Sequence, residues 1–376
     1  MTYRERASGI ECYKVIAIGL IVLSHVIQTI CNPVPQLPLA KSQFLNIYQA
    51  SHNPTNILLG MLQICGILGN HMFLICSVWF LRESKKQNDA KIIHMVLDVW
   101  IINLCVFGIL HLFHIPMERW DTIRVLFPTM FALNWYITCY ILLYRLHPYL
   151  NRFLDSLAPQ EHVHLMTEMF FLYYVLPVFV EGKVYFFNEM IQFVTIYVTV
   201  SFFKRYRLDL CEDRKKNRNL FCGALFFYVG LYLGWNQLGL HIQAFAWMAQ
   251  HFTIPNSLFM FGVAFSSFQW FRQYKGVHTF LNRIASSSLI VYIVHENLLF
   301  RTYIRPWIEV RVFEMFCYRH CVLLVFQMAL VLAIVSFGVS VIYQSLMNRR
   351  VEALSRWLLE KFCKIWNRYQ TKVLAK

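Results

Sequence analysis

The chain has 376 residues, of which 58% are hydrophobic and only 15% are charged, and its mean hydropathy is +0.46. This balance excludes an ordinary soluble domain, and apolar stretches of about 20 residues recur too often for a soluble core. The net charge of +15 would suit nucleic acid, but the basic residues lie between the apolar stretches. We therefore expect a membrane protein with lipid-bilayer contacts and no nucleic-acid partner.

Ten apolar stretches predict an all-α, polytopic membrane bundle of about ten transmembrane helices. They lie at 10–30, 58–81, 92–113, 126–147, 166–181, 186–204, 219–237, 245–271, 284–303 and 321–346. The fifth stretch is short and contains Pro177, and Pro255 breaks the long eighth one. With this division, 27 of the 35 Lys and Arg residues fall on the side that holds both termini. The positive-inside rule then places both termini in the cytoplasm.

The chain reads as one membrane domain, 1–347, followed by a basic tail, 348–376. Apolar residues recur at helical spacing from Val351 to Tyr369, with basic residues between them. This pattern predicts an amphipathic helix on the cytoplasmic membrane surface, and a frayed basic tail is the alternative. The first apolar stretch lacks a small-residue cleavage site, so we expect no cleavable signal peptide.

The first apolar stretch carries the most informative pair, Lys14 and His25. Eleven residues make roughly three helical turns, so the two side chains align on one face about 16 Å apart. A histidine deep in an apolar span usually faces an interior cavity and has a function. Glu11 lies three residues before Lys14 and can form a local ion pair with it. The plainer interpretation is a hydrogen-bonded core histidine and a snorkelling lysine.

The ninth stretch places His295, Glu296 and Asn297 in succession. His295 follows Arg283 by 12 residues, which is about the depth of His25 beyond Lys14. Because the first and ninth spans run in the same direction, two imidazoles and a carboxylate could share one cavity and exchange protons. Further polar or aromatic residues in the apolar stretches are candidates for that cavity: Ser24, His71, Ser77, Trp135, Tyr136 and Asn297. His71 could instead be a core histidine whose hydrogen bonds are satisfied.

A basic segment follows the second apolar stretch at the expected cytoplasmic surface. Its candidate ligands for the phosphates of a nucleotide-type donor are Arg82, Lys85, Lys91 and His94, with Lys14 nearby. An ordinary positive-inside loop would look similar. The scattered cysteines contain no CxxC pair, and His111 and His114 lack a third ligand, so no metal site is expected.

Four segments resemble the acyltransferase family 3 membrane proteins. The opening helix of that family often has a Glu, then an Arg three residues later, then an apolar run that ends in a His. The first stretch here is similar, with Glu11, Lys14 and His25, and Lys14 stands in place of the Arg. HMFLICSVWFL at 71–81 resembles a phenylalanine-rich FFxxSGYFL run, and NWYITCYILLYRLHPYLN at 134–151 is close to WYIxxYILLYLLxPxLN. SSSLIVYIVHENLL at 286–299 resembles SYxxYLxHxxL. The family's Arg-xx-Arg pair at the third span is here Lys91 and His94.

The resemblance implies a membrane O-acyltransferase of the bacterial cytoplasmic membrane. Such a protein moves an acyl group, most often acetyl, from acyl-CoA to a hydroxyl of a cell-surface polysaccharide or lipid-linked glycan. Acetyl-CoA would be a substrate, with no bound cofactor. His25 would act in catalysis, assisted by Glu11, His295 and Glu296, and Lys14 would stand near the donor.

Two other hypotheses stay open. One is a proton-coupled transporter or flippase of a glycan or amphiphile, with His25, His295 and Glu296 as a proton relay. The other is an inactive acyltransferase paralogue, which the replacement of Arg by Lys14 allows.

Overall fold

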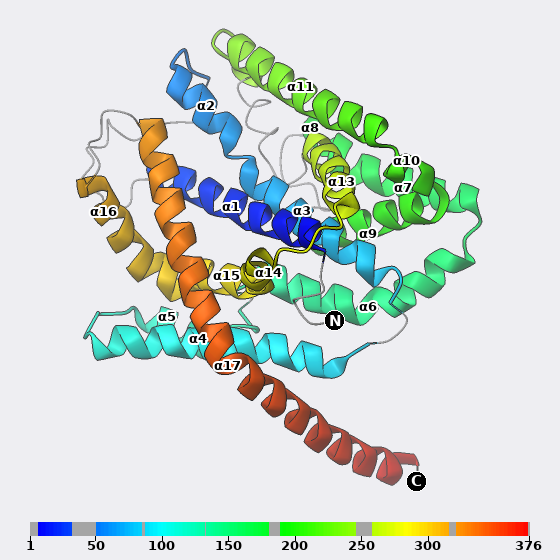
Figure 1. The fold of residues 1–376 in the computed structure, drawn as a ribbon, viewed down its shortest axis with the longest axis vertical. Helices are drawn as coiled ribbons and strands as arrows, with labels where there is room; N and C mark the ends of the chain where they lie inside the picture. The colour runs from blue at the N-terminus through cyan, green and yellow to red at the C-terminus, as the bar shows by residue number, and fades with distance from the viewer. Residues whose placement is uncertain are drawn as a thin grey trace.

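The computed structural model describes residues 7–31, 50–84, 87–131, 133–179, 189–245, 258–315 and 321–374. All regular secondary structure in these ranges is helical, which confirms the all-α class (Figure 1). Lys85, Pro255 and the last two residues of the tail fall outside the described residues.

The helices follow one another in short segments, several of them separated by only a turn. In chain order they are α1 (Ser8–Cys31), α2 (Pro54–Leu62), α3 (Cys65–Leu81), α4 (Asp89–Leu112), α5 (Arg119–Leu126), α6 (Trp135–Ser156), α7 (Pro159–Phe170), the π-helix η3 (Phe171–Val175), α8 (Leu176–Phe179), α9 (Glu189–Tyr206), α10 (Leu208–Glu212), α11 (Arg214–Gly239), α13 (Leu258–Gln273), α14 (Thr279–Ser286), α15 (Ser288–His295), the π-helix η4 (Phe300–Ile304), α16 (Arg305–Met315) and α17 (Cys321–Leu374).

Four helical segments in the described ranges are long and apolar enough to cross a membrane. They are Ser8–Thr29, Pro54–Leu81, Asp89–Leu112 and Val322–Asn367. These segments confirm the first, second, third and tenth predicted stretches and identify a membrane protein. The six other predicted stretches correspond, within the described residues, to helices that are shorter, broken or more polar.

Helix α1 lies in the middle of the bundle, with α4 and α11 toward opposite edges (Figure 1). It packs against α3, α13, α14, α15 and α17. The contact with α3 is close because α3 presents glycines: a Cβ at Gly66 would lie 2.7 Å from Oγ of Ser24, and one at Gly69 would lie 2.5 Å from the carbonyl oxygen of Ala17. Small residues at such crossings let two helix backbones approach each other.

The fourth predicted stretch is displaced along the chain. The sequence predicted 126–147, whereas α6 begins at Trp135 and ends at Ser156. The segment before it forms turns, in which Leu133 N–H donates to the carbonyl of Pro128 at 3.0 Å. At the other end, the helix continues through polar residues because Asn151 and Asp155 bind Arg82 of the neighbouring helix end.

The ninth predicted stretch, 284–303, is several short helices rather than one. The hydroxyls of Ser286, Ser287 and Ser288 each donate to the backbone carbonyl three residues earlier, at 2.6–2.7 Å. Such bonds compete with the helical ladder and favour a break between α14 and α15. A second break follows His295, where the side chain of Asn297 accepts from Phe300 N–H at 3.0 Å. The break places Glu296 at the end of a helix.

Helix α17 continues without interruption from the tenth apolar stretch into the basic tail. The predicted boundary at 347 is therefore not marked by a turn in the described residues. The C-terminal part of α17 extends beyond the other helices (Figure 1).

Candidate active site

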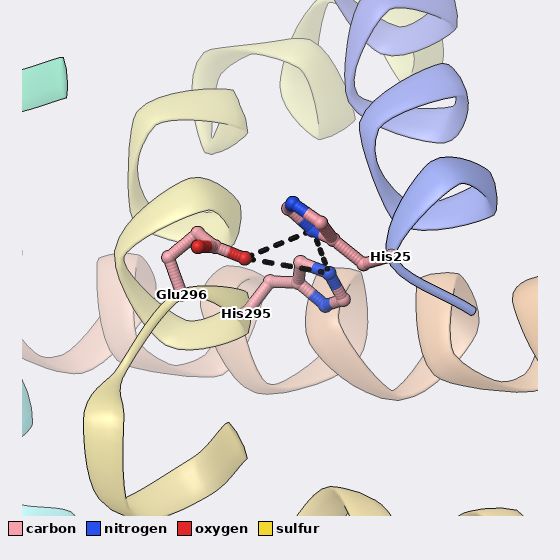
Figure 2. Close-up of side chains that lie close together, drawn as sticks. All are labelled: His25, His295 and Glu296. Atoms are coloured by element: carbon pink, nitrogen blue, oxygen red, sulfur yellow. Dashed lines mark hydrogen bonds and ion pairs between the residues drawn. The ribbon is translucent and has the colours of Figure 1, made fainter. Parts of the chain in front are cut away.

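Two histidines and a glutamate from helices far apart in sequence meet in the bundle (Figure 2). Nδ1 of His25 lies 3.0 Å from Nε2 of His295 and 2.9 Å from Oε1 of Glu296. The two imidazole rings are stacked, with centroids 5.2 Å apart. His295 and Glu296 are buried, and the side chain of His25 keeps 22% of its surface exposed. The sequence indicated that these three residues could share a cavity, and the structure brings the three side chains into contact.

The three residues of this cluster lie near the C-terminal ends of two helices, α1 and α15. His25 lies six residues before Cys31, the last residue of α1, and hence about 9 Å from that end. His295 ends α15, and Glu296 is the residue that caps it. The carboxylate of Glu296, at this helix end, reaches His25 of α1.

Glu296 determines which nitrogen of His25 carries a proton. An ionised carboxylate only accepts hydrogen bonds, so the contact at 2.9 Å assigns the hydrogen to Nδ1 of neutral His25. The lone pair is then on Nε2. Figure 2 shows that this second ring nitrogen points away from both His295 and Glu296. The arrangement therefore offers an imidazole that is oriented by a carboxylate and whose second nitrogen forms no hydrogen bond with the residues that the structure describes.

Two arginines that the sequence analysis did not select lie beside the cluster. The guanidinium of Arg301 approaches Oε2 of Glu296 at 3.8 Å. Arg305 donates to Oγ1 of Thr29 at 3.1 Å, and Thr29 in turn donates to the backbone carbonyl of His25 at 3.1 Å. Arg301 faces the carboxylate, whereas Arg305 holds the end of α1 against α16.

Arg305 forms a buried ion pair with Glu309, which follows it by four residues on α16. Its Nε lies 3.5 Å from Oε1 of Glu309, which is only 1% exposed. Burial raises the pKa of the Glu309 carboxyl to about 7, although the nearby Arg305 acts in the opposite direction. Burial also lowers the pKa of Arg305. The pair is therefore sensitive to pH near neutrality.

The cluster also has donor atoms in a spacing that a metal ion could use. Nδ1 of His25, Nε2 of His295 and Oε1 of Glu296 lie 2.9–3.9 Å from one another. Two imidazoles and a carboxylate are ligands that Zn²⁺ accepts. The positive charge of Arg301 near the only carboxylate of the set opposes a divalent cation. The donors fit a proton-transfer group better than a metal site.

Glu11 and Lys14 do not join the histidine cluster. Oε2 of Glu11 lies 2.6 Å from Nζ of Lys14, as the spacing of three residues predicted. Glu11 precedes His25 by fourteen residues of one continuous helix and therefore lies about 21 Å away along its axis. A direct role for Glu11 beside His25 is incompatible with this distance, because the two side chains lie near opposite ends of α1.

The polar residues next to the cluster bind other helices. Oγ of Ser24 donates to the backbone carbonyl of Gln63 at 2.8 Å. Nδ2 of Asn297 donates to Oδ1 of Asn103 at 3.0 Å. Both side chains are thus buried and engaged between helices.

The remaining cavity candidates pack against aromatic side chains of the bundle. His71 is buried, with Nδ1 2.8 Å from the carbonyl of Ile67 and Nε2 2.7 Å from the hydroxyl of Tyr174. Its two nitrogens are satisfied, which fits the core interpretation. Trp135 contacts Tyr136, whose ring lies 5.5 Å from that of Tyr292, three residues before His295. Ser77 lies within hydrogen-bonding reach of Tyr140.

The basic residues predicted to bind a donor separate into two groups. Arg82 is engaged by the carboxylate of Asp155 and by Oδ1 of Asn151 at 3.2 Å. Arg82 also lowers the pKa of Asp155 through this contact. Lys91 and His94 instead line a pocket of about 390 Å³ between α4, α15 and α17. The structure thus separates Arg82 from the other two, and Lys85 lies outside the described residues.

The pocket contains polar groups that the sequence analysis missed. Asp98 is 3% exposed and lies one turn after His94. It approaches Nε2 of His94 at 3.3 Å and accepts a hydrogen bond from the hydroxyl of Tyr343 at 2.8 Å. Glu352 and Arg356 from the C-terminal part of α17 complete the lining. The only sequence signal was the spacing of His94 and Asp98, an aspartate in an otherwise apolar stretch.

No family model matches this chain, and neither a curated protein nor a solved structure matches it.

Proposed function

We propose that the protein is a membrane O-acyltransferase. It moves an acyl group, with acetyl as the expected one, from acyl-CoA to a hydroxyl of a cell-surface polysaccharide or lipid-linked glycan. The observation that carries the proposal is the contact of 2.9 Å between Nδ1 of His25 and Oε1 of Glu296, with Nε2 pointing away. The four segments that resemble acyltransferase family 3 add support, and His25 lies in one of them and Glu296 in another.

The chemistry requires a base because an alcohol is a poor nucleophile. With the acceptor hydroxyl about 3 Å from Nε2 of His25, its oxygen attacks the thioester carbonyl carbon and its proton passes to Nε2. Glu296 stabilises the imidazolium that forms. When the tetrahedral adduct collapses, the C–S bond breaks and Nε2 returns the proton to the leaving CoA thiolate. Arg301, whose guanidinium lies 3.8 Å from Oε2 of Glu296, is the proposed source of positive charge for the developing oxyanion.

The donor is proposed to enter from the pocket between α4, α15 and α17. Lys91, His94 and Arg356 supply positive charge at its lining, where Asp98 pairs with His94 and Glu352 pairs with Arg356. The positive charge that these acids do not compensate suits the phosphates of acyl-CoA. Ile290 lines this pocket and lies five residues before His295 on the same helix, so about 7.5 Å separates them along the axis. A flexible thioester arm can cover that distance.

The proposed topology has ten spans, with both termini in the cytoplasm of a bacterial cell. The charge distribution supports it, since 27 of 35 basic residues then lie inside. In this topology the donor pocket faces the cytoplasm and His25 lies nearer the outer end of α1. An acceptor glycan would reach His25 from outside.

A proton-coupled transporter remains the second candidate. The hydrogen bond of 3.0 Å between His25 and His295 favours it, because linked imidazoles can pass protons. This candidate requires proton-coupled flux and yields no acylated product. An inactive acyltransferase paralogue would share the fold and show neither activity.

Membranes that contain the protein and a glycan acceptor distinguish these functions. We expect label from radiolabelled acetyl-CoA on the glycan fraction, in amounts that follow the expression of the protein. Membranes from cells with an empty vector are the control. Absence of label with acetyl-, succinyl- and longer acyl-CoA, together with substrate-dependent proton flux, would replace the acyltransferase with the transporter.

A further inference from the structure

A second, larger cavity lies away from the histidine cluster. It has a volume of about 760 Å³ and is bordered by α7, η3, α9, α11 and α13. None of the residues that line it belongs to the His25 cluster or to the pocket of Lys91. Its volume lies within the roughly 300–1,000 Å³ of typical ligand sites.

The walls of this groove are almost entirely apolar. Phe170, Phe203 and Phe265 come from three different helices, and the π-helix η3 contributes Phe171 and Val175. The outer surface of α11 beside the groove is also apolar, with Phe226 72% exposed. In a membrane protein such a surface faces hydrocarbon. An occupant that enters from the membrane therefore needs an apolar body.

One end of the groove is polar and basic. Lys216 lies there, with its side chain 61% exposed and Nζ 3.4 Å from Oδ2 of Asp213. The segment 204–218, which includes Lys216, has seven basic and three acidic residues. Four of the basic residues form ion pairs: Lys204, Arg205, Arg207 and Lys216. Within the described residues, Lys215 and Arg218 form none, so the positive charge of the segment is only partly compensated. The charge at this end attracts an anionic group.

The length of the groove corresponds to one leaflet. Lys216 and Phe227 both line it and are eleven residues apart on α11, which gives about 16 Å along the axis. The hydrocarbon core of a bilayer is about 30 Å thick, so one leaflet contributes about half of that. The basic end lies at the surface where the positive-inside rule places the cytoplasm.

We infer that this groove holds an acyl chain of an anionic phospholipid from the cytoplasmic leaflet, with the phosphate beside Lys216. The chain fills the space between α9, α11 and α13, and the headgroup interacts with the basic start of α11. The inference is independent of the proposed acyl transfer, except that the term cytoplasmic leaflet relies on the proposed topology.

Two glycines of α11 provide a matched pair of variants. A Cβ at Gly223, which lines the groove, would meet no atom within 4 Å, and the same holds for Gly230, which does not line it. A tryptophan at Gly223 would fill the groove, whereas one at Gly230 would lie on the exposed surface of the same helix. Both substitutions carry the same change in helix propensity.

The test is native mass spectrometry of the purified full chain with dioleoyl phosphatidylglycerol or dioleoyl phosphatidylcholine. We expect the native chain to retain phosphatidylglycerol at least tenfold more strongly. Gly223→Trp should lose this retention by about tenfold, and Gly230→Trp should keep it. Lys216→Gln should bring both lipids to similar retention and still tests the inference if Gly223→Trp does not fold. Equal retention of both lipids by the native chain, or unchanged retention by Gly223→Trp, would overturn it.

Discussion

The proton on His25 is assigned by a single neighbour. Because the carboxylate of Glu296 accepts at 2.9 Å, it fixes the tautomer in which Nε2 is basic, and it compensates the charge of the imidazolium. A glutamine in its place keeps the size but can turn its amide N–H₂ toward Nδ1, which favours the opposite tautomer.

We therefore expect Glu296→Gln to lower the rate constant of acyl transfer by roughly 10²–10⁴-fold. The KM for acyl-CoA should change little, because the donor pocket does not include Glu296. Steady-state kinetics in membranes measure both constants, with the exposed Glu118→Gln as the control. A variant that keeps full activity would show that Glu296 does not orient the base.

Glu309 makes the stability of the folded protein depend on pH, and the stability should decrease as the pH rises. Its pKa is raised from 4.5 to about 7, so the folded protein binds this proton more tightly than the unfolded chain does. The resulting stabilisation is full below about pH 4.5 and is lost as the pH rises through about 7. The difference between these two pKa values of Glu309 corresponds to at most about 3 kcal/mol in the free energy of unfolding.

We expect the thermal midpoint of the purified protein to decrease as the pH rises from 5 to 8. Glu309→Gln should make this decrease smaller. Melting curves in detergent across this range measure the effect. Glu314→Gln, an exposed change on the same helix, should leave the pH dependence as it is. A native midpoint that stays constant or increases with pH would contradict the role of Glu309.

At the scale of residues, the sequence predicted the central cluster but not its surroundings. His25, His295 and Glu296 could be grouped because the depth of each in an apolar stretch can be counted from the sequence. Arg301 and Arg305 could not, since basic residues at the end of the ninth stretch and just after it read as an ordinary boundary between a span and an outer loop. Their contacts arise from the turn at Asn297, which returns the chain toward α1.

Among the helices, α1 and α3 pack closely at two glycines of α3, Gly66 and Gly69. The segment 65–69 of α3 carries both glycines, and a Cβ at either one would lie less than 3 Å from an atom of α1. A methyl group at Gly69 would meet a backbone oxygen and Cγ1 of Ile21 at 2.5–2.6 Å, so the helices would have to separate.

Gly69→Ala should therefore destabilise the protein by about 1–3 kcal/mol. Gly108→Ala on α4, where a Cβ meets no atom within 4 Å, should be neutral or slightly stabilising because alanine favours helix. Thermal unfolding of both variants in the same detergent provides the comparison. Equal midpoints for the two variants would be inconsistent with the close packing of α1 on α3.

The breaks in the ninth stretch are a feature that hydrophobicity alone does not predict. Residues 284–303 are apolar enough to read as one span, but three consecutive serines and the cap of Asn297 divide them. These breaks depend on side-chain hydrogen bonds with the backbone, which compete with the helix only in a particular packing. The break after His295 is the one that forms the site.

For the whole molecule, the described residues provide four clear candidate spans rather than ten. Helices such as α6 and α11 include charged ends, so their mean hydropathy is lower than that of a simple span. Length and composition were enough to predict the class and four of the spans. The remaining boundaries depend on how polar helix ends pair with one another, as Arg82 and Asp155 do.

The proposed topology predicts which surface is accessible from each side of the membrane. In a cysteine-free background, a single cysteine at position 363 should react with an impermeant maleimide only in inverted vesicles, because the tail is placed inside. Met130→Cys in the same background should react in intact cells, since residue 130 is 82% exposed on the proposed outer side. Labelling of both positions from one side would refute the proposed orientation.

The measurement that addresses the central claim most directly is single-turnover transfer from radiolabelled acetyl-CoA by expression-matched membranes. It compares the native chain with His25→Ala and with His111→Ala, an exposed histidine of α4. We expect label on the glycan fraction with the native chain and His111→Ala, and a loss of about 10²–10⁴-fold with His25→Ala. Transfer that survives in His25→Ala at the native rate would contradict the account, because the base that activates the acceptor would then lie elsewhere.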